Sequence, residues 1–274
     1  MIAHASSLEH VSLALVGLAS IALYGWAWFG IRHASPWRLV AWAAGVATVL
    51  VSVLPAMERW SQRSFSGHMV QHLAMIVVAS PLLVVAKPVG TIRALGWGPK
   101  HTTPVERGLA RRWRSHGAIV SAAAFVLVLY ATHLTTIYDS ALRNRFVHDV
   151  EHVAYLASAI ALWAALRSAG RQSGPERIGA VFAVIGGSAL LGIVLISASS
   201  PLIATYEDRL GPVDALADQR SAASLMWVGG MATTLPLLLI AVWSWASAEE
   251  RIAERRESLV DATSTSSTGS DVQR

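Results

Sequence analysis

Seven stretches of mostly apolar residues, each close to bilayer-crossing length, constrain the fold of this chain more than any other feature. A transmembrane helix needs about 20 such residues. The chain is 54% hydrophobic and 14% charged, whereas a soluble domain usually has about 25% charged residues. We therefore predict an all-α, polytopic membrane protein with seven transmembrane helices in one bundle. The predicted spans are residues 8–31, 39–57, 68–86, 117–136, 150–166, 178–199 and 222–246.

Lys and Arg residues are unequally distributed between the two sides of these spans. If the N-terminus lies outside, 16 of the 22 basic residues fall on the inner side and 6 on the outer side. Cytoplasmic loops carry the excess of basic residues, so we expect an outer N-terminus and a cytoplasmic C-terminus. We expect residues 1–248 to form the membrane domain, and residues 249–274 to form a charged, then Ser/Thr-rich tail with a disordered end. The net charge of +5 is then explained by basic residues in cytoplasmic loops beside the lipid. We therefore expect no nucleic-acid partner.

Two histidine pairs open the third and fifth predicted spans. His68 and His72 are four residues apart, as are His148 and His152, so both rings of a pair project from one helix face. His133 lies near the outer end of the fourth span. Ionisable residues in membrane spans are usually functional, and imidazole is the commonest metal-binding side chain. We predict that these five histidines share one depth near the outer face and bind a metal ion or a cofactor.

The amino-acid composition narrows the choice of metal. The chain has no cysteine, which excludes thiolate metal sites, disulfides and cysteine nucleophiles. Zinc and copper remain as metals that favour imidazole, and copper binds a given nitrogen site more tightly. Met75 follows His68 by seven residues, so it can either offer a thioether that suits Cu(I) or pack as an ordinary apolar residue. The pattern leaves the oxidation state of the copper open.

Acidic residues complete the predicted outer layer. A carboxylate that accepts the second N–H of a ligand histidine orients the ring and raises its basicity. Asp218 directly precedes the seventh span, so it is the candidate for this role or for a metal ligand. Its alternative role is a negative charge at a helix N-terminus, which the helix dipole favours. Acidic residues on this side include Asp139, Asp149, Glu151, Glu207, Asp208, Asp214 and Asp218.

Three segments resemble the signature segments of CtaG-type cytochrome c oxidase assembly factors. They read GHMVQHLAMIVVASPLLVVAKP from residue 67, HLTTIYDSALRNRFVHDVEHVAYLASAIALW from residue 133 and DQRSAASLMWVGGM from residue 218. The resemblance extends from about the second span to the seventh. It implies a multi-pass protein of the bacterial plasma membrane that delivers copper to an oxidase subunit, which would be the copper-containing core. It also implies that the family-type polar positions are His68, His72, His148, His152 and Asp218.

The chain departs from this family pattern in its third span and at its N-terminus. The family often has two prolines after the third-span histidines, whereas Ser80 precedes Pro81 here. Pro81 alone should still bend the span, because it lacks a backbone N–H and clashes with the preceding turn. The histidines lie well above this bend, so we expect metal binding to be unaffected. His4 and His10 have no counterpart in the resemblance.

Two other functions fit paired histidines on neighbouring helices. A haem-binding electron-transfer protein could clamp its iron between two such pairs, and a Soret absorption band would identify it. A di-metal membrane oxidase is third, because such proteins typically use more histidines and adjacent His-His pairs, which this chain lacks. No nucleophile–base pair, phosphate loop or nucleotide motif is evident, so we expect a metal-handling protein and not an enzyme.

Overall fold

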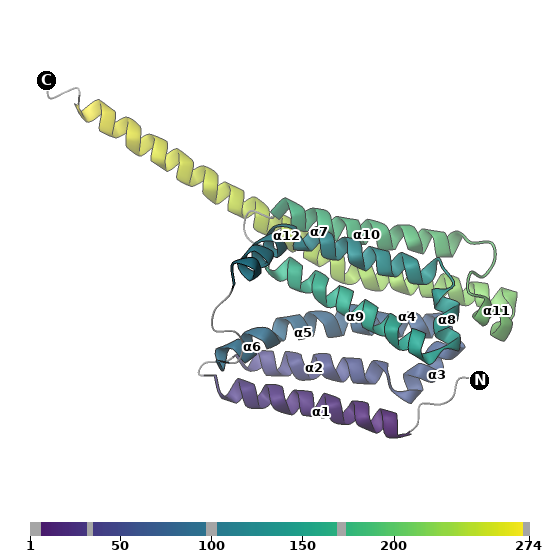
Figure 1. The fold of residues 1–274 in the computed structure, drawn as a ribbon. Helices are drawn as coiled ribbons and strands as arrows, with labels where there is room; N and C mark the ends of the chain where they lie inside the picture. Colours follow the sequence, from purple (N-terminus) through teal and green to yellow (C-terminus); the bar gives the residue numbers. More distant parts are fainter. Residues whose placement is uncertain (1–6, 32–34, 97–102, 169–173, 271–274) are drawn as a thin grey trace.

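The structure is a computed structural model that describes residues 7–31, 35–96, 103–168 and 174–270. Within these ranges the chain forms helices and no strand (Figure 1). Six helices are long and apolar enough to cross a membrane, or seven if the bent pair α2 (Pro36–Ser52) and α3 (Pro55–Arg63) forms one span. The predicted all-α membrane fold is confirmed.

The remaining elements follow the order of the predicted spans. The first span is α1 (Ser7–Phe29). The third consists of α4 (Phe65–Leu73), the π-helical segment η1 (Ala74–Ala79) and α5 (Ser80–Ala86), continued by α6 (Pro88–Ala94). The later spans are α7 (Pro104–His133), α9 (Arg145–Ser168), α10 (Gly174–Ser197) and α12 (Pro212–Ser270). Two short helices, α8 (Ile137–Arg143) and α11 (Ala204–Leu210), lie with α3 and the start of α1 at one end of the bundle (Figure 1).

Helix packing leaves one long helix at the edge of the bundle. The helix α10 packs against α12 and α7, α7 packs against α9, and α4 packs against α12 and α3. By contrast, α1 lies at the side of the bundle (Figure 1), where it packs against α2 and α6, and its Tyr24 donates a hydrogen bond to the Ala86 oxygen of α5. The largest apolar core joins Tyr138, Leu191 and Tyr206 with their neighbours, so it lies beside the end that carries α8 and α11.

The second predicted span is not one straight helix. The helix α2 ends at Ser52, and α3 begins at Pro55 with a bend of 52° between them. Pro55 explains the break, because proline lacks a backbone N–H and pushes the preceding residue out of the helical region. Leu54 has extended backbone angles accordingly, with φ −65° and ψ 149°. The bend turns the polar helix α3 back over the end of the bundle.

Pro81 is accommodated by the π-helical segment that directly precedes it. Proline has no N–H to donate to the carbonyls of the previous turn, which would leave acceptors unpaired inside the bilayer. One of these acceptors, the Ile76 oxygen, accepts a hydrogen bond from Trp163 Nε1 at 3.2 Å. The Met75 oxygen accepts one from the Ser80 backbone N–H and another from Ser80 Oγ, the latter at 2.8 Å. The predicted irregularity therefore occurs as a wider helical turn, on the C-terminal side of the two histidines of α4.

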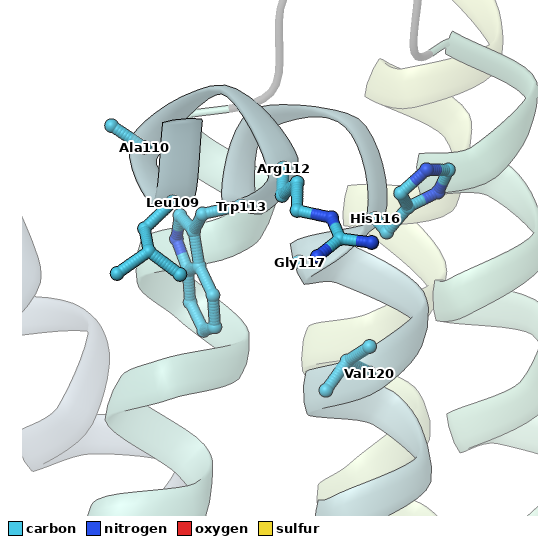
Figure 2. Close-up of a pocket in the computed structure, with 7 residues that line it drawn as sticks. All are labelled: Leu109, Ala110, Arg112, Trp113, His116, Gly117 and Val120. Carbon is cyan, nitrogen blue, oxygen red and sulfur yellow. The ribbon is translucent and has the colours of Figure 1, made fainter. Parts of the chain in front are cut away.

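The helix α7 begins well before its apolar stretch because Thr103 caps it. Thr103 Oγ1 accepts a hydrogen bond from Glu106 N, and Glu106 Oε2 accepts one from Thr103 N, an arrangement that stabilises helix starts. In these first turns Arg112, Trp113 and His116 border a shallow hollow (Figure 2). Basic and aromatic side chains in such a place are typical of a membrane interface.

The C-terminal tail begins as a continuation of the seventh span. The helix α12 runs through residues 249–258 to Ser270 and projects away from the bundle (Figure 1), and the disorder expected for the end of the tail stays a prediction. The Glu, Arg and Ala residues that follow the seventh span are strong helix formers. Extending an existing helix also avoids the cost of nucleating a new one.

Candidate metal centre

The two histidine pairs lie within the first eight residues of α4 and α9, and a polar residue caps each helix start. Asn144 Oδ1 accepts hydrogen bonds from Phe146 N and Val147 N, at 2.9 and 3.4 Å, before α9. Ser64 Oγ accepts one from Gly67 N at 3.0 Å before α4. These side chains satisfy backbone N–H groups that have no partner within the helix. The caps therefore determine where each helix begins and at what level its histidines lie.

The structure brings the two pairs together. His68 Nε2 and His72 Nε2 are 3.0 Å apart, and the rings of His148 and His152 have centroids 4.1 Å apart. Across the two helices, the centroids of His68 and His148 are 5.3 Å apart, as are those of His72 and His152. The imidazoles of the two pairs therefore converge on one another. Whether they bind a metal ion stays a prediction.

The side chains form two overlapping sets of possible ligands. The first contains His68, His148 and His152, and the second contains His68, His72 and Glu151. Within each set the ligand atoms lie within 4.8 Å of one another. His68 belongs to both sets, and its Nε2 lies 3.7 Å from Glu151 Oε2. His68 is therefore at the centre of the cluster.

Burial leaves several polar atoms of this cluster without partners. His68, His72, His148 and Glu151 are all buried. In the described part of the chain no hydrogen-bond partner exists for the atoms His68 Nδ1, His72 Nδ1, His148 Nε2, His152 Nε2 and both carboxylate oxygens of Glu151. A buried polar atom without a partner costs about 1–3 kcal/mol. These unpaired atoms of the cluster are therefore available to ligate an ion.

Two buried tyrosines cover the histidines of α4. The Tyr138 ring lies 4.6 Å from the His68 ring, and the Tyr155 ring lies 4.4 Å from the His72 ring. Burial raises the pKa of Tyr138 well above its usual value, so this side chain stays a neutral phenol. The tyrosines thus restrict ring movement and add no charge to the site.

His133 lies beside the cluster but outside both ligand sets. Its Nδ1 lies 2.9 Å from the Leu129 oxygen, 3.1 Å from Thr132 Oγ1 and 3.2 Å from Tyr155 Oη. Its Nε2 is buried and has no partner among the described residues. It therefore contacts Tyr155, whose ring packs on the His72 ring. Its predicted role as a ligand stays a prediction.

The structure gives Asp218 a different part from orienting a histidine. Its carboxylate accepts hydrogen bonds from Phe65 N at 2.5 Å, Ser66 N at 3.2 Å and Ser66 Oγ at 2.5 Å. Asp218 therefore provides a negative charge at a helix N-terminus, which was the alternative role predicted for it. The helix is α4, however, and not α12, to which Asp218 itself belongs. Met75 is buried at the second position of η1, and its role as a copper ligand stays a prediction.

Removing the Asp218 carboxylate is expected to loosen the start of α4. Asp218→Ala leaves two backbone N–H groups unpaired, so we expect a loss of about 1–2 kcal/mol in stability. Asp218→Asn keeps one accepting oxygen and should lose less. The measurement is the thermal unfolding of the detergent-solubilised protein. Equal unfolding temperatures for wild type and Asp218→Ala would contradict the capping role.

Three polar residues of this region did not stand out in the sequence. Glu151 was only one of several outer acidic residues, although its place between His148 and His152 on one helix was a usable signal. Glu58 lies 3.6 Å from His148 through its Oε2, and Gln71 Nε2 donates to Glu58 Oε1 at 2.9 Å. No sequence signal could have revealed the Glu58 contact, because it depends on the bend between α2 and α3.

The arrangement suits a transition-metal ion. Ligand atoms bound at about 2.0–2.2 Å from one ion lie roughly 3–4 Å apart, so the observed sets need little contraction. Four imidazoles, a carboxylate and no thiolate form a donor set for copper or zinc. The geometry alone does not choose between these ions.

Comparisons with known proteins indicate a family. A family model described as cytochrome c oxidase caa3 assembly factor matches residues 22–248. An uncharacterized protein of Mycobacterium leprae is 27% identical over 250 residues, which are 82% of this chain and 37% of that protein. Uncharacterized proteins of Mycobacterium bovis and Mycobacterium tuberculosis are each 26% identical over 256 residues, covering 84% of this chain and 38% of theirs. The chain thus spans less than two fifths of the length of these relatives. No solved structure matches it.

Proposed function

Because the chain belongs to the cytochrome c oxidase caa3 assembly factor family, we propose that it binds copper at the histidine cluster and delivers the ion to a cytochrome c oxidase subunit. The observation that carries this proposal is the convergence of four buried histidines from α4 and α9. Each of these histidines has a ring nitrogen without a hydrogen-bond partner among the described residues. The copper is cargo, and the protein acts as a metallochaperone without catalysing a reaction. The receiving subunit is the one that holds the copper-containing core of the oxidase.

The chemistry of the ligands supports copper over zinc. For a given nitrogen site, copper(II) binds more tightly than zinc. His68 and His72 approach one another closely at 3.0 Å, so a pair of imidazoles is available for the low coordination numbers that Cu(I) accepts. The neighbouring His148 and His152 can then join or leave as the ion is exchanged.

The packing around the cluster argues against the haem alternative. A haem clamped by paired histidines needs a flat space between the two helices, as wide as the macrocycle. The Tyr138 and Tyr155 rings pack at a tilt against the His68 and His72 rings, with centroids 4.6 and 4.4 Å apart, and they occupy the space beside the imidazoles. A single ion needs only a small contraction of the ligand sets, whose atoms lie within 4.8 Å of one another.

The position of the cluster supports exchange with a partner outside the membrane. The histidines lie at the end of the bundle that carries α3, α8 and α11, and the basic start of α7 lies at the opposite end (Figure 1). Since basic segments stay in the cytoplasm, the cluster faces the outer side of the plasma membrane. An ion held near this face is accessible to the outer domain of an oxidase subunit.

The orientation can be tested by reporter fusions. A reporter fused after Ala86 is expected to be cytoplasmic, and one fused after Thr136 is expected to be outside, because the inner segments hold 16 of the 22 basic residues. The pair of an alkaline phosphatase and a fluorescent protein reporter distinguishes the two sides. The reverse pattern would put the histidines on the cytoplasmic side and contradict delivery to an outer domain.

Copper binding can be tested directly on the purified protein in detergent. Competition with a chromophoric Cu(I) chelator is expected to give tight binding for wild type and for His116→Ala, since His116 is exposed in α7 at the opposite end of the bundle. The optical spectrum of the protein as isolated is expected to lack a Soret band. A Soret band, or no retention of Cu(I) by the wild type, would overturn the proposal.

A further inference from the structure

We propose that Glu58 is a positioning residue that holds His148 with its Nε2 directed to the metal ion. The inference rests on the proposed copper function and adds to it a residue on a different helix from any ligand. Its basis is one chain of contacts from the break between α2 and α3 to His148. No histidine–metal geometry needs to be assumed for it.

The bend between α2 and α3 carries Glu58 to the cluster. Pro55 starts α3, and Glu58 lies in the first turn of this helix, where its backbone N–H donates to the Leu54 oxygen at 2.9 Å. The 52° bend directs α3 across the starts of α4 and α9. The Glu58 side chain is 28% exposed, whereas the His148 side chain is only 4% exposed. The carboxylate therefore lies between the solvent and the buried imidazole.

Gln71 fixes the Glu58 carboxylate. Gln71 is fully buried on α4, between the two histidines of that helix. Its Nε2 donates to Glu58 Oε1 at 2.9 Å and to the Ser52 oxygen, the last residue of α2, at 2.7 Å. With Oε1 held in this way, Oε2 lies 3.6 Å from His148 Nδ1. A small rotation brings these two atoms to the hydrogen-bond distance of about 2.8 Å typical of such pairs.

The two nitrogens of His148 consequently have different roles. A carboxylate beside Nδ1 favours the tautomer that carries its proton there, which leaves the Nε2 lone pair free. His148 Nε2 is buried and has no partner within the described residues. It belongs to the set of His68, His148 and His152. Glu58 thus acts through His148, and the chain of Ser52, Gln71, Glu58 and His148 joins the bend of α2–α3 to the metal position.

A purely structural role for Glu58 predicts a different result. An acidic residue in the first turn of a helix is favoured by the helix dipole, and this alone would change stability without changing the affinity for a metal. Asp149 is a matched control: it follows His148 directly, but its carboxylate is 61% exposed and pairs with Arg145 at 3.7 Å. Removing its charge alters the surface near His148 without removing a contact to a histidine.

The test measures the Cu(I) affinity of the full-length protein by chelator competition. Glu58→Gln is expected to weaken binding by about 10–100-fold, as loss of a carboxylate that orients a ligand histidine typically does, while Asp149→Asn should leave it unchanged. Glu58→Asp should recover part of the affinity. The electron paramagnetic resonance spectrum of Cu(II)-loaded Glu58→Gln is expected to differ from that of the wild type, whereas that of Asp149→Asn should not.

A double-mutant cycle separates positioning from direct ligation. If Glu58 acts through His148, then Glu58→Gln has no further effect on affinity in a His148→Ala protein. Additive losses, or equal affinities and spectra of wild type and Glu58→Gln, would overturn the inference while the copper function stands. A wild type that binds no copper would overturn both. Thermal unfolding of each variant checks that a lost affinity does not reflect an unfolded protein.

Discussion

His68→Ala is expected to cause the largest loss of copper affinity of any single substitution in this protein. His68 belongs to both ligand sets, so its removal leaves neither set complete. Loss of an orienting residue alone typically costs 10–100-fold, and removal of a shared ligand should therefore exceed about 100-fold, or roughly 2.8 kcal/mol. The measurement is Cu(I) affinity by chelator competition on the purified protein.

The matched control for this prediction is His116→Ala. It removes an imidazole of the same size from an exposed position of α7, so the expected affinity is that of the wild type. The comparison of His152→Ala with Glu151→Gln then separates the two ligand sets, because each substitution removes a member of one set only. If His68→Ala retains wild-type affinity, the histidine cluster is not the copper site.

The second large effect is expected in cells that depend on a copper-containing oxidase. The double substitution His72→Ala with His152→Ala removes one histidine from each helix and one from each ligand set. At limiting copper we expect oxidase activity to fall to the level of a strain without this protein. Because both residues lie within the first eight residues of their helices, and not in the apolar middle of a span, the protein should still insert in the membrane.

Added copper distinguishes a delivery defect from a folding defect. Weakened binding is offset by mass action at higher copper concentration, so oxidase activity should partly return, whereas an unfolded protein would not be rescued. The measurement is oxidase activity in membranes, normalised to the amount of this protein, with and without added copper. Full activity of the double variant at limiting copper would contradict copper delivery.

The fold class could be predicted from the sequence because the bilayer imposes a local rule. Backbone groups inside the hydrocarbon must be satisfied within each helix, so apolar stretches of sufficient length correspond to the helices of the structure. The histidine pairs were predictable for a similar reason. Spacing by four residues fixes the shared face of a helix, and the position of each pair in its span fixes the depth.

The partners of the polar side chains depended on contacts between distant segments. Asp218 and Phe65 are far apart in sequence, and nothing in either segment predicts that the carboxylate caps α4. In the same way, Glu58 reaches His148 only because Pro55 redirects α3. The sequence offered several acidic residues at one depth and no means of choosing between them.

The spans, their order and the histidine faces were predictable, because they follow from hydrophobicity and helical periodicity over short stretches. Which helices are neighbours depends on packing between distant segments, and so do the sharing of His68 between two ligand sets, the place of Glu151 beside the histidines and the contact of Asp218 with the start of α4. Hydrogen bonds and metal ligation act over about 2–4 Å. At that range, a bend of one short helix decides which side chains meet.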